Sequence, residues 1–241
     1  MKIHLVNPNT TANMTQQALV AANKVRASTT KIIATQPDYG PVSIEGYYDE
    51  VFSIPGMLEL IAANNDCDAH VIACFDDTGL DAARCLADAP VVGICEAACL
   101  NAVLLANSFS IVTTLSRSVP ALQHLTTRYG MKERCVSVRA SDIAVLDLEN
   151  ETKEATDVLH REIEIALVKD GAEAIVLGCA GMTDMAESVS QKFGVPVIDG
   201  VSAAIKLAEG LVSQQLQTSR VRGYAKPINK PYSGKFSCYK P

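Results

Sequence analysis

Two segments of the chain repeat one pattern, and this repeat decides the expected fold. Residues 69–94 read AHVIACFDDTGLDAARCLADAPVVGI, and residues 173–199 read EAIVLGCAGMTDMAESVSQKFGVPVID. In each segment a short apolar run ends near a cysteine, Cys74 or Cys179, and is followed by a helical pattern, a proline and a second apolar run. Continuously apolar strands that alternate with helices are typical of a parallel sheet with helices on both faces.

The same alternation continues along most of the chain. Short apolar runs rich in β-branched residues predict eight strands, at residues 2–6, 31–35, 69–73, 90–94, 109–113, 135–138, 173–177 and 195–198. Helical patterns predict eight helices, at residues 14–27, 58–64, 80–86, 97–106, 119–129, 151–169, 182–192 and 202–211. We therefore expect an α/β protein with two pseudo-symmetric, doubly wound parallel-sheet lobes and an active site in the cleft between them.

The repeat also suggests where the lobes begin and end. We predict that residues 1–96 and about 205–241 form the first lobe and that residues 97–204 form the second. The last segment, residues 214–241, contains several prolines and glycines and no helical pattern. We predict that it is an extended tail that wraps the surface or contacts a neighbouring subunit.

Composition limits the classes of partner. The chain has 241 residues, of which 48% are hydrophobic, so it can bury a substantial core. Its net charge of −6 and the lack of a basic run argue against nucleic acid or an anionic membrane as a partner. No apolar run approaches the roughly 18 residues that span a bilayer. We expect a soluble, cytoplasmic protein that acts on a small molecule.

The eight cysteines are expected to be free thiols, because disulfide frameworks belong to small secreted domains without a large core. Metal-ligand spacing is absent: the nearest cysteine pair is Cys95-x-x-x-Cys99, and the four histidines are scattered. We expect no metal and no cofactor. Most of the cysteines are read as small buried hydrophobes. Cys74 and Cys179 differ because each stands at the same place in a repeated unit and precedes small or polar residues.

The position of these two cysteines indicates reactivity. The carboxyl end of a parallel strand opens towards a helix N-terminus, where ligands bind and where a thiol pKa can fall from about 8.5 towards neutrality. Thr78 and Asp81 predict a capping box for the helix that follows Cys74. Asp199, which follows the eighth strand, is expected to bond loop backbone and not a ligand.

Several reactions are open to two thiols that face each other. A redox disulfide is disfavoured because the cysteines lack the C-x-x-C spacing. A single nucleophilic cysteine would need a histidine as its base, and no histidine lies in either cysteine motif. Two-base proton transfer remains: a thiolate takes a proton from one face of a carbon acid, and a thiol gives one to the other face. This reaction is a racemisation without cofactor, and the two thiols should titrate as a coupled unit.

Polar residues at other strand ends are candidate ligand contacts. Asn9 and Thr10 follow the first strand, where they either contact a ligand or form an ordinary turn. Thr113 and Thr114 end the fifth strand, and their hydroxyls either hold a ring carbonyl or cap the next helix. Ser43 lies in a loop that either reaches the cleft or is a solvated turn.

Five motifs carry a resemblance to a known family. They are residues 7–10 (NPNT), 41–46 (PVSIEG), 73–75 (ACF), 110–114 (SIVTT) and 177–182 (LGCAGM). Together they resemble the hydantoin and allantoin racemase branch of the aspartate/glutamate racemase superfamily, from residue 1 to about residue 212. The resemblance implies two pseudo-symmetric α/β lobes, a site in the cleft between them, no cofactor, and Cys74 and Cys179 as the acid/base pair.

We also predict substrate contacts at the residues that flank the two thiols: Phe75, Asp76, Gly178 and Ala180. Members of this branch often read Cys-Phe-Gly-Asp-Pro-Gly where this chain reads Cys-Phe-Asp-Asp-Thr-Gly at residues 74–79. Asp76 is therefore an extra carboxylate, which we expect to raise the pKa of the neighbouring thiol and to change the polarity of the pocket.

The leading hypothesis is a cofactor-independent racemase of 5-substituted hydantoins, with allantoin as one candidate substrate, that uses two-base proton transfer at C5. One alternative is an amino-acid racemase of the aspartate/glutamate type. Another is a bilobal small-ligand binding protein without turnover. The Ala/Val/Leu-rich helical faces and the tail lead us to expect a homo-oligomer.

Overall fold

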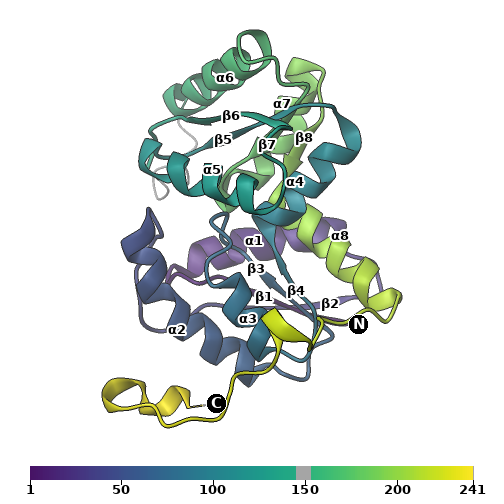
Figure 1. The fold of residues 1–241 in the computed structure, drawn as a ribbon. Helices are drawn as coiled ribbons and strands as arrows, with labels where there is room; N and C mark the ends of the chain where they lie inside the picture. Colours follow the sequence, from purple (N-terminus) through teal and green to yellow (C-terminus); the bar gives the residue numbers. More distant parts are fainter. Residues whose placement is uncertain (145–152, 241) are drawn as a thin grey trace.

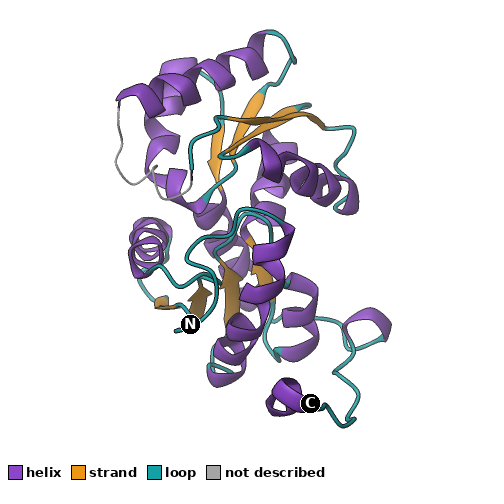
Figure 2. Ribbon diagram, turned by 90° about the vertical axis from the view of Figure 1, so that its left-hand side faces the viewer, coloured by secondary structure: helices purple, strands orange, loops and turns teal. Residues whose placement is uncertain are grey.

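Two four-stranded parallel sheets form the frame of the molecule (Figures 1 and 2). The structure is a computed structural model that describes residues 1–144 and 153–240. The first sheet has the order β2-β1-β3-β4, with β1 (Lys2–Val6), β2 (Lys31–Thr35), β3 (Ala69–Ile72) and β4 (Val91–Gly93). The second has the order β6-β5-β7-β8, with β5 (Phe109–Thr113), β6 (Cys135–Ala140), β7 (Ala174–Leu177) and β8 (Val197–Asp199). The same strand order occurs twice, so the predicted α/β class and the repeated lobe are confirmed.

Helices cover both faces of the first sheet, because side chains alternate along each strand and both sets are apolar. Leu5 points to one face and packs in a core cluster with residues of α1 (Ala12–Val25), α4 (Ile94–Leu105) and α8 (Gly200–Ser213). Val6 and Ile72 point to the other face, where they meet α2 (Tyr47–Ala63) and α3 (Leu80–Leu86). This lobe is doubly wound, as predicted.

The second sheet is covered in the same way. Ile111 packs on the side of α4 and α5 (Val119–Arg128), whereas Val112 packs on the side of α6 (Lys153–Val168) and α7 (Ala186–Phe193). The cluster that contains Ile111 also contains Leu5, so one core passes through both lobes by way of α4 and α8. The predicted lobe boundaries at residues 96/97 and 204/205 fall inside these two helices and stay a prediction.

Most predicted helices match the observed ones within a few residues, with two differences. α2 begins at Tyr47 and not at residue 58, and it continues through Pro55. The Ser53 hydroxyl donates to the carbonyl of Glu50 (2.9 Å) in the turn before the proline. The pattern at 182–192 divides into a 3-10 segment, η3 (Ala180–Met185), and α7. The predicted start of the α6 helix at residue 151 lies outside the described residues.

The C-terminal segment follows α8 and lies along the first lobe, where it is drawn in yellow (Figure 1). It contains two short 3-10 segments, η4 (Arg222–Tyr224) and η5 (Gly234–Tyr239). Arg220 donates to the carbonyl of Arg84 (2.8 Å), and Lys226 donates to the carbonyl of Leu86 (2.7 Å). The segment is therefore held against α3. No helix in the described ranges has both the length and the apolar character that crossing a membrane requires.

Candidate active site

A small cavity lies between the two lobes, at the carboxyl ends of their central strands. Its volume is about 40 Å³, which is room for roughly three water molecules. It is lined by Asn9, Met14, Ile44, Ala73, Cys74, Phe75, Asp76, Thr113, Thr114, Ser118, Gly178, Cys179 and Ala180.

The strand order explains this location. In the first sheet the chain passes from β1 to β2 on one side and then returns to β3 on the other, so the order reverses between β1 and β3. The second sheet reverses in the same way between β5 and β7. Ligands of open α/β sheets bind beyond the carboxyl ends of the strands at such a reversal. The loops that follow β1, β3, β5 and β7 all contribute to the cavity wall.

The two repeated cysteines line this one cavity from opposite lobes. Cys74 follows β3 after one alanine, and Cys179 follows β7 after one glycine. Both thiols are half-buried. All eight cysteines of the chain are free, without a disulfide. The Thr78 hydroxyl lies 3.4 Å from the Cys74 sulfur, to which it donates. The pair therefore presents a sulfur from each lobe to the same small space.

The expected lowering of the two thiol pKa values is wrong. Burial raises the pKa of Cys74 well above its usual value, and burial raises the pKa of Cys179 to about 11. No α-helix starts directly at either thiol: α3 begins only at Leu80, and Cys179 is followed by a 3-10 segment. The predicted Thr78/Asp81 capping box is also wrong, because Gly79, with φ of 67°, is the N-cap and the helix has no side-chain cap.

Asp76 supplies a carboxylate to the cavity wall beside Cys74. Burial, together with the nearby carboxylates of Glu50 and Asp77, raises the pKa of Asp76 to about 7. Asp76 in turn is the second cause, after burial, of the raised pKa of Cys74, which confirms the effect expected from the sequence. The cavity therefore contains three acidic groups, two thiols and a carboxyl, that all hold their protons more tightly than they would in water.

Most of the predicted binding residues are at the cavity. Seven of them line it: Asn9, Phe75, Asp76, Thr113, Thr114, Gly178 and Ala180. Thr10 and Ser43 are not among the lining residues. The amide of Thr10 donates to the carbonyl of Pro41 (3.0 Å), so Thr10 joins two loops instead of facing the cavity. In the loop of residues 41–46 it is Ile44, next to Ser43, that reaches the wall.

Hydrogen bonds hold the polar wall residues in place. The Asn9 side-chain oxygen accepts from the Asn7 amide (2.8 Å) and from the backbone N–H of Thr11 (2.9 Å). The Thr113 hydroxyl donates to the carbonyl of Gly178 (2.9 Å), so it fixes the turn that carries Cys179. Thr113 does not cap the following helix, whose first turn has no side-chain cap.

The sequence did not identify four lining residues: Met14, Ile44, Ala73 and Ser118. Three of them are apolar and look like ordinary core positions in the sequence. Ser118 precedes α5 and could have been found from the repeat, because it lies at the second-lobe counterpart of the first-lobe loop after β1. Apolar wall residues carry no chemical signal of their own, so only the folded backbone reveals them.

Two other predictions concern residues outside the cavity. Asp199 is the N-cap of α8, and its side chain accepts from the backbone N–H of Ser202 (2.9 Å), as expected. In the described residues, no group of three or more histidine, cysteine, aspartate or glutamate side chains is placed to hold a metal ion.

The fold and the site define a class of protein: a bilobal α/β protein in which each lobe contributes one thiol to a shared cavity. The family model described as "Asp/Glu/Hydantoin racemase" matches residues 3–208. The chain belongs to this family of isomerases.

Individual relatives cover nearly the whole chain. A hydantoin racemase of Rhizobium meliloti is 50% identical over 99% of this chain and 100% of its own length. A hydantoin racemase of Pseudomonas sp. (strain NS671) is 45% identical over 97% of this chain and 95% of its own. Among solved structures, the allantoin racemase from Klebsiella pneumoniae superposes with a TM-score of 0.96 at 44% identity, and covers 100% of this chain and 99% of that one.

Proposed function

We propose that this protein racemises 5-substituted hydantoins, with allantoin among the candidate substrates, without a cofactor. The observation that carries the proposal is the single cavity that Cys74 and Cys179 line from opposite lobes. The relatives of high identity are named hydantoin and allantoin racemases.

The proposed reaction is proton transfer through both thiols. Because the pKa of both thiols is raised, the reaction starts from the small fraction of the protein in which one thiol has lost its proton to solvent. For one enantiomer, the Cys74 thiolate takes the hydrogen of C5 as a proton, and the C–H electron pair moves into the adjacent carbonyl to give an enolate. The Cys179 thiol then gives its proton to the opposite face of C5. The product is the other enantiomer, with a thiol at Cys74 and a thiolate at Cys179, and that state is the starting point for the reverse direction. Each positioned acid or base contributes about 10²–10⁴-fold to such a step.

The charge of the cavity favours a hydantoin over a free amino acid. No lysine, arginine or histidine occurs among the described residues that line the cavity, so no side chain there can form an ion pair with a substrate carboxylate. Asp76, in the fraction that is ionised near its pKa of about 7, would repel such a group, and its oxygens can instead accept from a ring N–H. A hydantoin carries no carboxylate, and its carbonyl next to C5 already acidifies the C5 proton. The alternative of an aspartate/glutamate-type racemase is therefore the weaker one.

The test is isotope exchange together with loss of optical rotation. Each cysteine is changed singly, Cys74→Ser and Cys179→Ser, and the exposed Cys238→Ser variant is the control. We expect both cavity variants to lose at least about 10³-fold in racemisation of 5-benzylhydantoin in D₂O, and the control to match the wild type. Substantial racemisation by both cavity variants would contradict the mechanism. Binding of hydantoins by the wild type without C5 exchange would favour the alternative of a binding protein without turnover.

The preferred substituent is found by comparing allantoin with benzyl-, isopropyl- and methylthioethyl-hydantoin, with aspartate and glutamate beside them. Turnover of the amino acids in preference to every hydantoin would contradict the argument from the charge of the cavity.

We propose in addition that the protein is a homo-oligomer. α4 exposes Leu100, Leu104 and Leu105, of which Leu104 is 80% exposed in the single chain. Apolar side chains grouped on one helix are a common feature of subunit interfaces. Light scattering after gel filtration should give a mass above that of one chain. The cytoplasmic location stays a prediction, which cell fractionation would test.

A further inference from the structure

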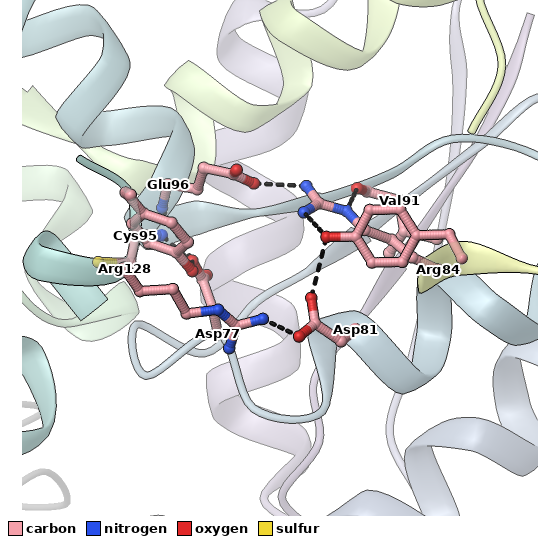
Figure 3. Close-up of polar contacts among 9 residues, drawn as sticks. Asp77, Asp81, Arg84, Val91, Cys95, Glu96 and Arg128 are labelled. Carbon is pink, nitrogen blue, oxygen red and sulfur yellow. Dashed lines mark hydrogen bonds and ion pairs between the residues drawn. The ribbon is translucent and has the colours of Figure 1, made fainter. Parts of the chain in front are cut away.

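A carboxylate close to the candidate site, but outside its cavity, joins the two lobes. Asp77 lies three positions after Cys74, and its side chain is only 5% exposed. Its oxygens accept from the backbone N–H groups of Cys95 (3.0 Å) and Glu96 (2.8 Å) at the start of α4, and from the hydroxyl of Tyr129 (2.5 Å) at the end of α5. Figure 3 shows Asp77 between the start of α4 and the end of the helix that carries Arg128.

The backbone of Asp77 belongs to the turn that carries Cys74. Its N–H donates to the carbonyl of Cys74 (3.0 Å), and its own carbonyl accepts from Leu80 (3.0 Å) at the start of α3. Its φ of 46° is unusual for a residue with a side chain, and such conformations persist where the surroundings fix them. A change in the hydrogen bonds of the Asp77 side chain therefore changes the position of the Cys74 thiol.

The second lobe shows that the fold does not need a helix cap from a distant turn. α8 is the counterpart of α4, and it is capped by its own N-cap residue, Asp199. The N-cap of α4 is Gly93, which has no side chain, and Asp77 supplies the cap from a distant turn. A Cβ atom at Gly93 would lie 2.3 Å from an Asp77 carboxylate oxygen. The close approach of the Asp77 carboxylate therefore requires a glycine at position 93.

Ion pairs surround Asp77 but are more exposed. Arg128 pairs with Asp81, and both side chains are about half exposed; Arg84 pairs with Glu96 (Figure 3). An exposed pair such as Arg128–Asp81 contributes little to stability. The Tyr129–Asp77 hydrogen bond is different, because it is part-buried and its acceptor belongs to a side chain that is only 5% exposed. A hydrogen bond shielded from water is stronger than one at the surface. This hydrogen bond ties the Cys74 turn to the second lobe.

We propose that Asp77 is a positioning residue that, through Tyr129, sets the place of the Cys74 thiol relative to the second lobe and hence to Cys179. Asp77 does not touch the cavity, so it acts through the turn and not on the substrate. The catalytic part of this proposal rests on the proposed racemisation. The geometric part does not, since it concerns only where the Cys74 thiol is held.

The test uses Tyr129→Phe and Asp77→Asn. Tyr129→Phe removes the interlobe hydrogen bond and keeps the Asp77 carboxyl, whose pKa rises when the hydroxyl that lowers it is lost. Asp77→Asn removes the charge altogether, so an effect that both variants share reports position. Tyr239→Phe, which removes a hydroxyl contact to Tyr39 at the surface, is the matched control, and Arg128→Gln tests the exposed ion pair. Displacement of a catalytic group by about 1 Å can cost 10²-fold in rate. We expect kcat for a hydantoin to fall by about 10- to 100-fold in Tyr129→Phe and Asp77→Asn, and to stay near the wild-type value in both controls.

A second readout is independent of activity. Iodoacetamide labelling at Cys74 and Cys179 is followed by peptide mass spectrometry well below the melting temperature of each variant. We expect the Cys74:Cys179 labelling ratio to change by threefold or more in Tyr129→Phe, because the freed turn alters access to Cys74 alone. An unchanged ratio in folded Tyr129→Phe would overturn the proposal, whatever the activity. A changed ratio in a protein that racemises no hydantoin would uphold the positioning role and reject the proposed function. Should Asp77→Asn fail to fold, Tyr129→Phe still decides the question.

Discussion

Asp76 makes the stability of the protein depend on pH in an unusual direction. Its pKa of about 7 in the folded protein lies above the ordinary value of 3.8. Between these values the folded state keeps a proton that the unfolded state has lost, so the contribution of Asp76 to stability falls as pH rises.

Asp76→Asn should therefore gain on the wild type as pH rises. We expect the difference in unfolding free energy to shift in favour of the variant by up to about 2 kcal/mol from pH 5 to pH 7, measured by urea denaturation. The matched control is Asp88→Asn, an exposed carboxylate whose pKa its partner Lys226 holds below the ordinary value. Its difference from the wild type should be flat over this range. If the difference in unfolding free energy between Asp76→Asn and the wild type did not change with pH, the Asp76 carboxyl of the wild type would be well solvated.

Gly178 is a second residue with a sharp steric requirement. A Cβ atom there would lie 2.8 Å from Cβ of Thr113 and 3.0 Å from a methyl of Ile111. The backbone after β7 therefore packs directly on β5, and this approach sets the path of the turn that carries Cys179.

Gly178→Ala should displace that turn. We expect a loss of about 1–3 kcal/mol in stability from overpacking and a fall in racemisation of about 10²-fold. Gly210→Ala is the matched control, because a Cβ in α8 at that position meets nothing within 4 Å. That variant should be more stable than the wild type by about 0.5–1 kcal/mol, with unchanged activity. Wild-type activity in a folded Gly178→Ala protein would show that the turn tolerates the shift.

At the scale of elements, α8 depends on its cap. The Asp199 side chain accepts from Ser202 in the first turn, and α8 packs against both α1 and α4 in the core that joins the lobes. Asp199→Ala should lower the free energy of unfolding by about 1 kcal/mol, whereas Asp199→Asn keeps an acceptor and should stay close to the wild type. Urea denaturation measures both. Equal losses in the two variants would show that charge, and not the capping bond, is what matters.

The sequence was most informative about the secondary-structure elements. All eight predicted strands are present, because a buried parallel strand must be a short continuous apolar run and such runs are easy to recognise. The start of α2 was missed because Pro55 reads as a boundary, although the preceding turns continue through it. The cap of α4 could not be predicted at all. It comes from Asp77, which lies in another turn, and helix caps are usually sought within the helix's own first residues.

For the whole molecule, the repeat predicted a shared cavity but not its detail. Equivalent strand ends in two like sheets must face one space if the lobes pack about a pseudo-twofold axis, and Cys74 and Cys179 do line one cavity. The raised thiol pKa values depend on how deeply both lobes bury that space, which a linear pattern does not encode. Thr10 was predicted at the cavity because it follows the first strand, and Ser43 because its loop could reach the cleft. The neighbouring Asn9 and Ile44 line the wall instead, so one position decides whether a side chain points in or out.

A cavity built by both lobes should make ligand binding visible in the stability of the entire chain. A ligand at about 100 times its dissociation constant stabilises a protein by about 2.7 kcal/mol, and about 1 kcal/mol raises the melting temperature of a domain of this size by about 2–4 °C. We therefore expect 5-benzylhydantoin to raise the melting temperature of Cys74→Ser, which cannot turn it over, by roughly 5–10 °C at saturation. Glutamate at the same concentration should give no shift, because the cavity wall carries Asp76 and no cation among its described residues. An equal shift with glutamate would show that the wall accepts a carboxylate after all, and the argument for a neutral ring would then fail.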